Sequence, residues 1–128
     1  MIPKLKIPLT FISLVGILAA CQGGGSPSDA VQNYLQAVVE ADWAQAVSLS
    51  CAQWEEGARV EASSFEAVEA RLEGVSCSEE AEQGDDRLIS CQGVILATYG
   101  VEDQELQLEG RLYRAIYEGG DWRMCGYQ

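Results

Sequence analysis

The chain has 128 residues, with 20 acidic and 8 basic side chains, a net charge of −12 and no histidine. The lack of histidine excludes imidazole acid–base catalysis, Ser-His and Cys-His nucleophiles and histidine-ligated metal sites. The acidic charge repels phosphate backbones, so no nucleic-acid partner is expected.

The first 20 residues predict an export signal. Lys4 and Lys6 make the start of the chain positive, and residues 7–20 form an apolar stretch of secretory type. As a helix this stretch spans roughly 21 Å, which is short of the ~30 Å hydrocarbon core that a permanent membrane span must cross. We therefore expect a signal peptide, and a retained transmembrane helix is the alternative.

The residues Leu18, Ala19, Ala20 and Cys21 form a lipobox, so this region resembles the precursors of bacterial lipoproteins. The resemblance implies that the chain is cut before Cys21, whose thiol takes a diacylglyceryl group and whose amine takes an acyl group such as palmitate. It also implies a membrane partner through the lipid anchor, and an extracytoplasmic location on a bacterial cell membrane or outer membrane. An ordinary signal peptide followed by a chance cysteine is the alternative.

This reading divides the chain into three parts: a signal peptide at 1–20, a lipidated cysteine with a flexible tether at 21–27, and one domain at 28–128. The tether is rich in glycine, which gives flexible linkers. The roughly 100 remaining residues suffice for a single core.

The four cysteines of the domain predict two disulfides, because an even number in an exported domain favours pairing. A four-thiolate zinc site is the alternative, but the cysteine spacings of 26, 14 and 34 residues contain no C-x-x-C pair. Counting alone leaves three pairings open. A hairpin turn centred on residue 84 places Cys77 opposite Cys91, which leaves Cys51 to pair with Cys125.

Three helices are predicted first. Ser26 caps the first helix, Asp42 caps the second, and Ser63 caps a third that ends at Gly74. Cys51 is expected on the buried face of the second helix. The apolar positions at helical spacing are, in chain order, Val31, Tyr34, Leu35, Val38; Trp43, Ala46, Val47, Cys51, Trp54; and Phe65, Val68, Leu72.

Four strands follow, because the apolar period changes to two after Gly74. They are expected near residues 75–82, 88–99, 105–117 and 122–127. In the third strand the even-numbered residues are expected to face the core. A turn between Val101 and Glu102 places Ile95 opposite Leu108, Ala97 opposite Leu106, and Gly93 opposite Gly110, where the sheet can bend.

This layout resembles the nuclear transport factor 2-like superfamily, which includes the ketosteroid-isomerase and SnoaL types. The resemblance covers residues 26–128, and a cystatin-like sheet around one helix is the structural alternative. It implies an α+β cone, with three N-terminal helices packed on a curved four-stranded antiparallel sheet. It is carried by Ala30, Val31, Tyr34, Leu35, Ala37, Val38, Asp42, Trp43 and Ala46, and by Tyr113, Tyr117, Gly119, Gly120, Asp121, Trp122, Arg123, Met124 and Cys125.

Such a cone implies a pocket at the open end of the sheet. Candidate lining residues are Tyr34, Trp43, Trp54, Tyr99 and Arg114, although aromatic residues at helical spacing also suit a plain core. Arg114 is separated by two residues from the apolar Leu112 and Ile116 of its strand, so we expect it on the same, concave face of the sheet. A buried guanidinium needs a partner, which we expect to be Asp42, Glu40 or the carboxylate of a ligand.

Isomerases of this superfamily use a carboxylate base in an apolar pocket opposite a tyrosine, and no convincing core-facing carboxylate stands out in the sequence. We therefore expect a non-catalytic domain that binds an envelope protein or a small apolar ligand, with no cofactor and no metal. One alternative is an isomerase or cyclase acting on a hydrophobic substrate, and another is a structural component whose cone is filled. A pocket carboxylate with a strongly raised pKa beside a tyrosine hydroxyl would favour the enzyme.

Overall fold

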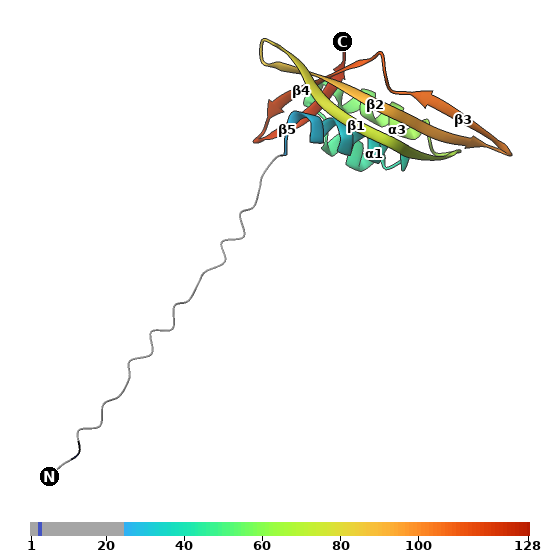
Figure 1. Ribbon diagram of the computed structural model, residues 1–128, viewed down its shortest axis with the longest axis horizontal. Coiled ribbons are helices and arrows are strands. Elements are labelled where there is room, and N and C mark those ends of the chain that lie inside the picture. Colours follow the sequence, from blue (N-terminus) through green and yellow to red (C-terminus); the bar gives the residue numbers. More distant parts are fainter. Residues whose placement is uncertain (1–2, 4–24) are drawn as a thin grey trace.

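The computed structural model describes residues 3 and 25–128. The domain is α+β, with helices first and five antiparallel strands after them (Figure 1). The helices are α1 (Pro27–Val39), α2 (Trp43–Ser48), the short 3₁₀ helix η1 (Ala52–Trp54) and α3 (Glu55–Ser63). The strands are β1 (Glu69–Gln83), β2 (Asp86–Tyr99), β3 (Glu102–Gln107), β4 (Leu112–Glu118) and β5 (Asp121–Tyr127).

The predicted signal peptide, Cys21 and the tether as far as residue 24 lie outside the described residues. Within residues 3 and 25–128, no helix combines the length and the apolar character that crossing a membrane requires.

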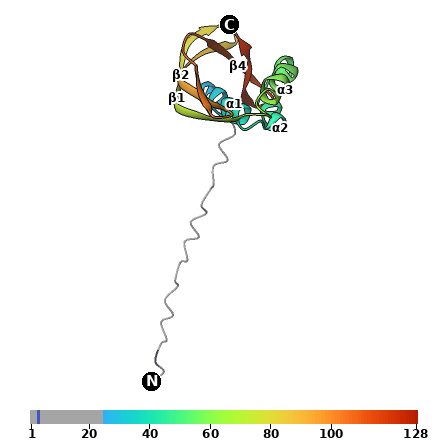
Figure 2. The ribbon, with the colours of Figure 1, turned by 90° about the vertical axis from the view of Figure 1, so that its right-hand side faces the viewer.

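The sheet curls around α1, with α3 beside it (Figure 2). Strands lie in the order β1-β2-β4-β5, and β3 also pairs with β2. One edge of β2 pairs with β1, while its other edge pairs with β4 at residues 87–90 and with β3 at residues 94–99. The predicted curved antiparallel sheet is therefore confirmed, but with five strands instead of four.

The single strand predicted near residues 105–117 is wrong, because the chain leaves the ladder between β3 and β4. The Leu108 amide still donates to the Gly93 carbonyl at 3.1 Å, and Gly110 then takes a positive φ of 87°. After this break the inward and outward positions alternate again, but the odd-numbered residues now face the core instead of the even-numbered ones. Tyr113 and Ala115 face the core, whereas Arg114 faces outward.

The predicted β2–β3 register is wrong by two positions. Ile95 pairs with Leu106 and Ala97 with Gln104, because Gly100 and Val101 alone form the turn. A shift of two keeps the same residues on each face.

The sheet bends at Gly93, but Gly110 is not its partner. Gly93 has a φ of 104° and lies against a bulge of β1 between Glu73 and Ser76. A Cβ added at Gly93 would lie 2.6 Å from the Gly74 carbonyl oxygen, so only glycine fits there. Bulges bend and twist the strand that carries them, which explains the curvature.

The starts of α1 and α2 are as predicted. The Asp29 amide donates to the Ser26 side chain at 3.1 Å, and the Asp29 carboxylate accepts from the Ser26 amide. The Asp42 carboxylate accepts from the Gln45 amide at 3.1 Å and so caps α2. These contacts satisfy backbone donors that a helix start leaves free.

The predicted lengths of the second and third helices are wrong. Cys51 is buried but follows α2 in an extended segment, where its amide donates to the Met124 carbonyl at 2.8 Å. The third helix, α3, ends at Ser63, where the predicted helix begins. From Glu69 onward exposed and half-buried residues alternate, which is the period of β1.

Both predicted disulfides are present. Cys77 and Cys91 are directly opposite in the β1–β2 ladder, with Cα atoms 4.1 Å apart. Cys51 and Cys125 have Cα atoms 5.2 Å apart and tie the segment after α2 to β5.

The core lies between α1 and the concave face of the sheet. Its fully buried side chains include Val31, Tyr34, Val38, Ile89, Tyr113 and Met124. Burying each large apolar side chain contributes about 1.5–3 kcal/mol, so this face of α1 holds the helix against the curved sheet.

Candidate functional site

A pocket of about 330 Å³ lies where α1, the end of α3 and the break between β3 and β4 meet. Most of its walls are apolar or aromatic, which is typical of sites for small molecules, and its volume is at the lower end for such sites. We call it the Glu61 pocket. Its lining residues are Leu35, Val38, Glu61, Phe65, Ile95, Glu105, Leu106, Gln107, Leu108, Arg111, Tyr113 and Tyr127.

Helix α3 places the carboxylate of Glu61 in this pocket. Ala58, Glu61, Ala62 and Phe65 follow one another at helical spacing, and Ala58 and Ala62 are fully buried. Glu61 therefore lies on the core-facing side of α3. The Tyr127 hydroxyl of β5 donates to this carboxylate, with Oη 2.6 Å from Oε1 and 2.7 Å from Oε2.

A chain of hydrogen-bonding groups leads from the interior to Glu61. Trp54 Nε1 donates to the Tyr34 hydroxyl at 3.0 Å, which leaves the Tyr34 proton free to be donated to Glu61. The Tyr127 ring packs edge-on against Trp54, with ring centroids 5.5 Å apart, and lies 5.2 Å from Tyr113. Glu61 thus has a tyrosine donor, Tyr127, whose ring is held by aromatic packing.

Burial raises the pKa of Glu61 above its ordinary value of 4.5. Hydrogen bonds from Tyr127 and Tyr34 and the positive charge of Arg111 lower this pKa, but they do not cancel the effect of burial. Burial, followed by the charge of Glu61, raises the pKa of both Tyr34 and Tyr127. Glu61 therefore takes up a proton more readily than an exposed glutamate, and both tyrosines remain hydrogen-bond donors.

Arg111 supplies the positive charge that lines the pocket. It lies in the break between β3 and β4, directly after Gly110, and its side chain is exposed. The guanidinium carbon lies 5.5 Å from the centroid of the Tyr127 ring. Such a placement allows a cation–π interaction.

The five candidate residues from the sequence do not meet in one pocket. Trp54 donates a hydrogen bond to the Tyr34 hydroxyl next to the Glu61 pocket. Trp43 is 42% exposed, with the Arg59 guanidinium 4.4 Å above its ring. Tyr99 is 47% exposed, at the end of β2.

Arg114 faces away from the core, because the alternation reverses after Gly110. Its guanidinium lies 2.8 Å from the Asp86 carboxylate, so the expected partners Asp42 and Glu40 are wrong. The contact joins β4 to the start of β2. Both side chains are partly exposed, and this ion pair serves the sheet rather than a ligand.

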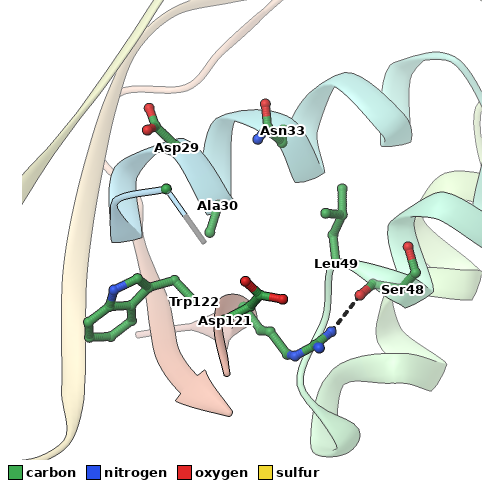
Figure 3. A pocket seen from close by; sticks show the side chains of 9 residues that line it. Asp29, Ala30, Asn33, Ser48, Leu49, Asp121 and Trp122 are labelled. Atoms are coloured by element: carbon green, nitrogen blue, oxygen red, sulfur yellow. Dashed lines mark hydrogen bonds between the residues drawn. The ribbon is translucent and has the colours of Figure 1, made fainter. Parts of the chain in front are cut away.

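A second hollow, of about 250 Å³, lies between the start of α1, the end of α2 and the start of β5 (Figure 3). The Arg123 guanidinium there donates to the Ser48 carbonyl at 2.6 Å and to the Glu118 carbonyl at 2.9 Å. The Asp29 carboxylate belongs to the cap of α1. These polar groups already serve the fold, so the Glu61 pocket is the better candidate site.

In the part of the chain that the structure describes, no group of three or more acidic or cysteine side chains is placed to hold a metal ion. Comparisons with known proteins found no match to a protein family, to a curated protein or to a solved structure.

Sequence reasoning missed Glu61, Arg111 and Tyr127. The helical spacing of Ala58, Glu61 and Ala62 was a readable sign that a carboxylate faces the core. Arg111 could not be assigned, because its position depends on the break between β3 and β4.

Proposed function

We propose that this chain is a lipid-anchored domain of the nuclear transport factor 2-like type, held outside the cytoplasm, that binds a small and largely apolar molecule in the Glu61 pocket. The observation that carries this proposal is the pocket itself, with apolar walls from α1, β2 and β3 and a partly buried carboxylate among them. The pocket favours a small ligand over an envelope protein as the partner.

The superfamily assignment is supported by the arrangement of the elements. Helices precede a curved antiparallel sheet, and the pocket lies between α1, α3 and the sheet. The enzyme-like features of the superfamily do not follow from the fold alone, because one fold hosts many functions.

The lipid anchor is supported by the lipobox and by its distance from the domain. Gly25 follows Cys21 by four residues, and an extended chain of this length reaches at most roughly 14 Å. Lipidation of Cys21 would therefore hold the domain close to the bilayer. Each buried methylene of the acyl chains contributes about 0.8 kcal/mol to this attachment.

The anchor is tested by expressing the full chain and a Cys21→Ser variant in a bacterium and separating membranes from soluble material. We expect the parent protein in the membrane fraction, with an intact mass that includes the acyl groups. The variant should lose that added mass and leave the membrane. A variant that stays equally attached would reject the anchor.

The pocket is tested with phenylnaphthylamine, a neutral apolar dye whose fluorescence rises on binding. Leu106 lines the pocket and is 42% exposed, so a Leu106→Trp substitution can fill the pocket at little cost to the fold. Val101→Trp on the same hairpin is the matched control, because Val101 is fully exposed. We expect Leu106→Trp to abolish binding and Val101→Trp to leave it unchanged; dye binding that Leu106→Trp does not alter would reject the pocket.

A second candidate function is an isomerase or cyclase, and the raised pKa of Glu61 beside the Tyr127 hydroxyl is the observation that favours it. A carboxylate whose pKa is raised can exchange protons with a substrate, while a tyrosine hydroxyl donates to a substrate oxygen. The test is exchange of the α-hydrogens of cyclohexenone in heavy water. Exchange that Glu61→Gln removes would support catalysis, and equal rates for both proteins would reject it.

A further inference from the structure

The six arginines of this chain all lie in the described part, and five of them have polar partners there. The shortest guanidinium–carboxylate distances are 3.9 Å for Arg59 and Glu56, 3.7 Å for Arg71 and Glu73, 3.2 Å for Arg87 and Glu79, and 2.8 Å for Arg114 and Asp86. Arg123 donates to two carbonyls. Arg111 has no hydrogen-bond or ion-pair partner among the described residues, in a chain with 20 acidic residues.

Arg111 also differs from the others in its place, because it lines the Glu61 pocket. Its guanidinium lies over the Tyr127 ring, and a contact with the face of a ring leaves the N–H groups free for other acceptors. The planar fork of donors matches the two oxygens of a carboxylate.

We infer that the ligand of the Glu61 pocket is an amphiphile with a carboxylate head, which Arg111 binds while Phe65, Leu106 and Leu108 contact the apolar part. This inference rests on the proposed function. It adds the charge of the ligand and the residue that recognises it.

Two carboxylates, of Glu61 and Glu105, line the same pocket and oppose an anionic ligand. The Tyr127 hydroxyl donates to Glu61, and the raised pKa of Glu61 means that it gives up its negative charge more readily than an exposed glutamate. Glu105 is exposed on β3, where water and salt screen its charge. Among the described residues that line this pocket, Arg111 is therefore the cation whose N–H donors are left for a carboxylate.

The experiment compares three probes with one chain length and different heads: octanoate, octanol and octylamine. Each is titrated into the folded domain while the backbone amide and arginine Nε–H resonances are followed by NMR. We expect octanoate to bind about tenfold more tightly than octanol, since a charged hydrogen bond contributes about 1.5–3 kcal/mol and 1.4 kcal/mol is a factor of ten. The Arg111 Nε–H resonance should move only with octanoate.

An Arg111→Gln variant should bind octanoate about tenfold more weakly and leave octanol binding unchanged. Arg59→Gln is the matched control, because it removes the same charge away from the pocket. It should leave all three affinities unchanged. Arg111→Lys, which keeps the charge, should retain part of the preference for octanoate, and thermal unfolding checks that each variant is folded.

The possible outcomes separate this inference from the proposed function. Equal affinity for octanoate and octanol, or an octanoate affinity that Arg111→Gln does not change, rejects the inference that the ligand has a carboxylate head. The proposal that the pocket binds a small apolar molecule is then retained. Tighter binding of octylamine also overturns it and assigns recognition to Glu61 and Glu105. No shift of pocket resonances with any probe overturns the proposed function and this inference with it.

Discussion

The Tyr127 hydroxyl donates to the Glu61 carboxylate at 2.6 and 2.7 Å and so links β5 to α3 across 66 positions of the sequence. This contact places an ionisable group in an apolar pocket and gives it donors at the same time. Its pKa is the balance of two opposing effects, burial and hydrogen bonding.

A Glu61→Gln substitution should change how stability depends on pH. Well below pH 4.5 the glutamate is protonated in both states. As the pH rises, the unfolded chain releases this proton first, so the contribution of Glu61 to the free energy of unfolding is lost up to the raised pKa of the folded state. The free energy of unfolding of the parent protein minus that of Glu61→Gln should therefore be smaller at about pH 7 than at about pH 4. Urea unfolding of both proteins measures the difference, and a difference that does not vary with pH would contradict the raised pKa.

A Tyr127→Phe substitution should raise the pKa of Glu61 further, because it removes a hydrogen bond that favours the charged carboxylate. It should also lower the free energy of unfolding at neutral pH by about 2 kcal/mol, as expected for a hydrogen bond to a charged group. Carbon NMR of the Glu61 carboxyl measures the pKa. Tyr99→Phe, at an exposed position, is the control and should change neither quantity.

The two disulfides should contribute unequally to stability. They join residues 74 and 14 positions apart, and the chain-entropy model gives roughly 4.5 and 3 kcal/mol for loops of these lengths. Replacing Cys51 and Cys125 together by alanine should therefore destabilise the domain more than replacing Cys77 and Cys91. Denaturant unfolding of the two double variants decides the order, and the reverse order would show that strand pairing outweighs loop length.

A Gly93→Ala substitution should be strongly destabilising, by about 3 kcal/mol or more. Its Cβ would lie 2.6 and 2.8 Å from the carbonyl oxygens of Gly74 and Glu73, and its φ of 104° is also unfavourable. Gly84→Ala is the matched control, because that position has a positive φ but open space around it. We expect it to cost about 1 kcal/mol, and equal costs at both positions would show that backbone strain alone explains the loss.

Local signals in the sequence predicted local structure well. Ser26 and Asp42 cap the first two helices because their short polar side chains can satisfy backbone donors only at a helix start. The turn near residue 84 joins β1 to β2, and a bulge between Glu79 and Ala81 shifts the register by one residue and so places Cys77 opposite Cys91. Each of these features depends on a few neighbouring residues.

The errors arose where local patterns fit two structures or where distant contacts decide. Phe65, Val68 and Leu72 suit a helix by spacing, but the alternation from Glu69 to Glu73 belongs to β1 and is fixed by pairing with β2. Sequence alone could not reveal the break after Leu108, because β2 changes its partner from β3 to β4 there. This break reversed the face assigned to Arg114, brought Arg111 to the pocket and so decided the candidate site.

The Cys51–Cys125 bond closes a covalent ring that includes α3 and most of the sheet, whereas α1 and α2 precede it in the chain. A pulling force on the segment before Gly25 therefore reaches α1 before any cross-linked part of the domain. The packing of side chains such as Val31 and Val38 and the hydrogen bond from Trp54 Nε1 to the Tyr34 hydroxyl oppose the detachment of α1. Under tension α1 should separate first, while the ring holds the strands together.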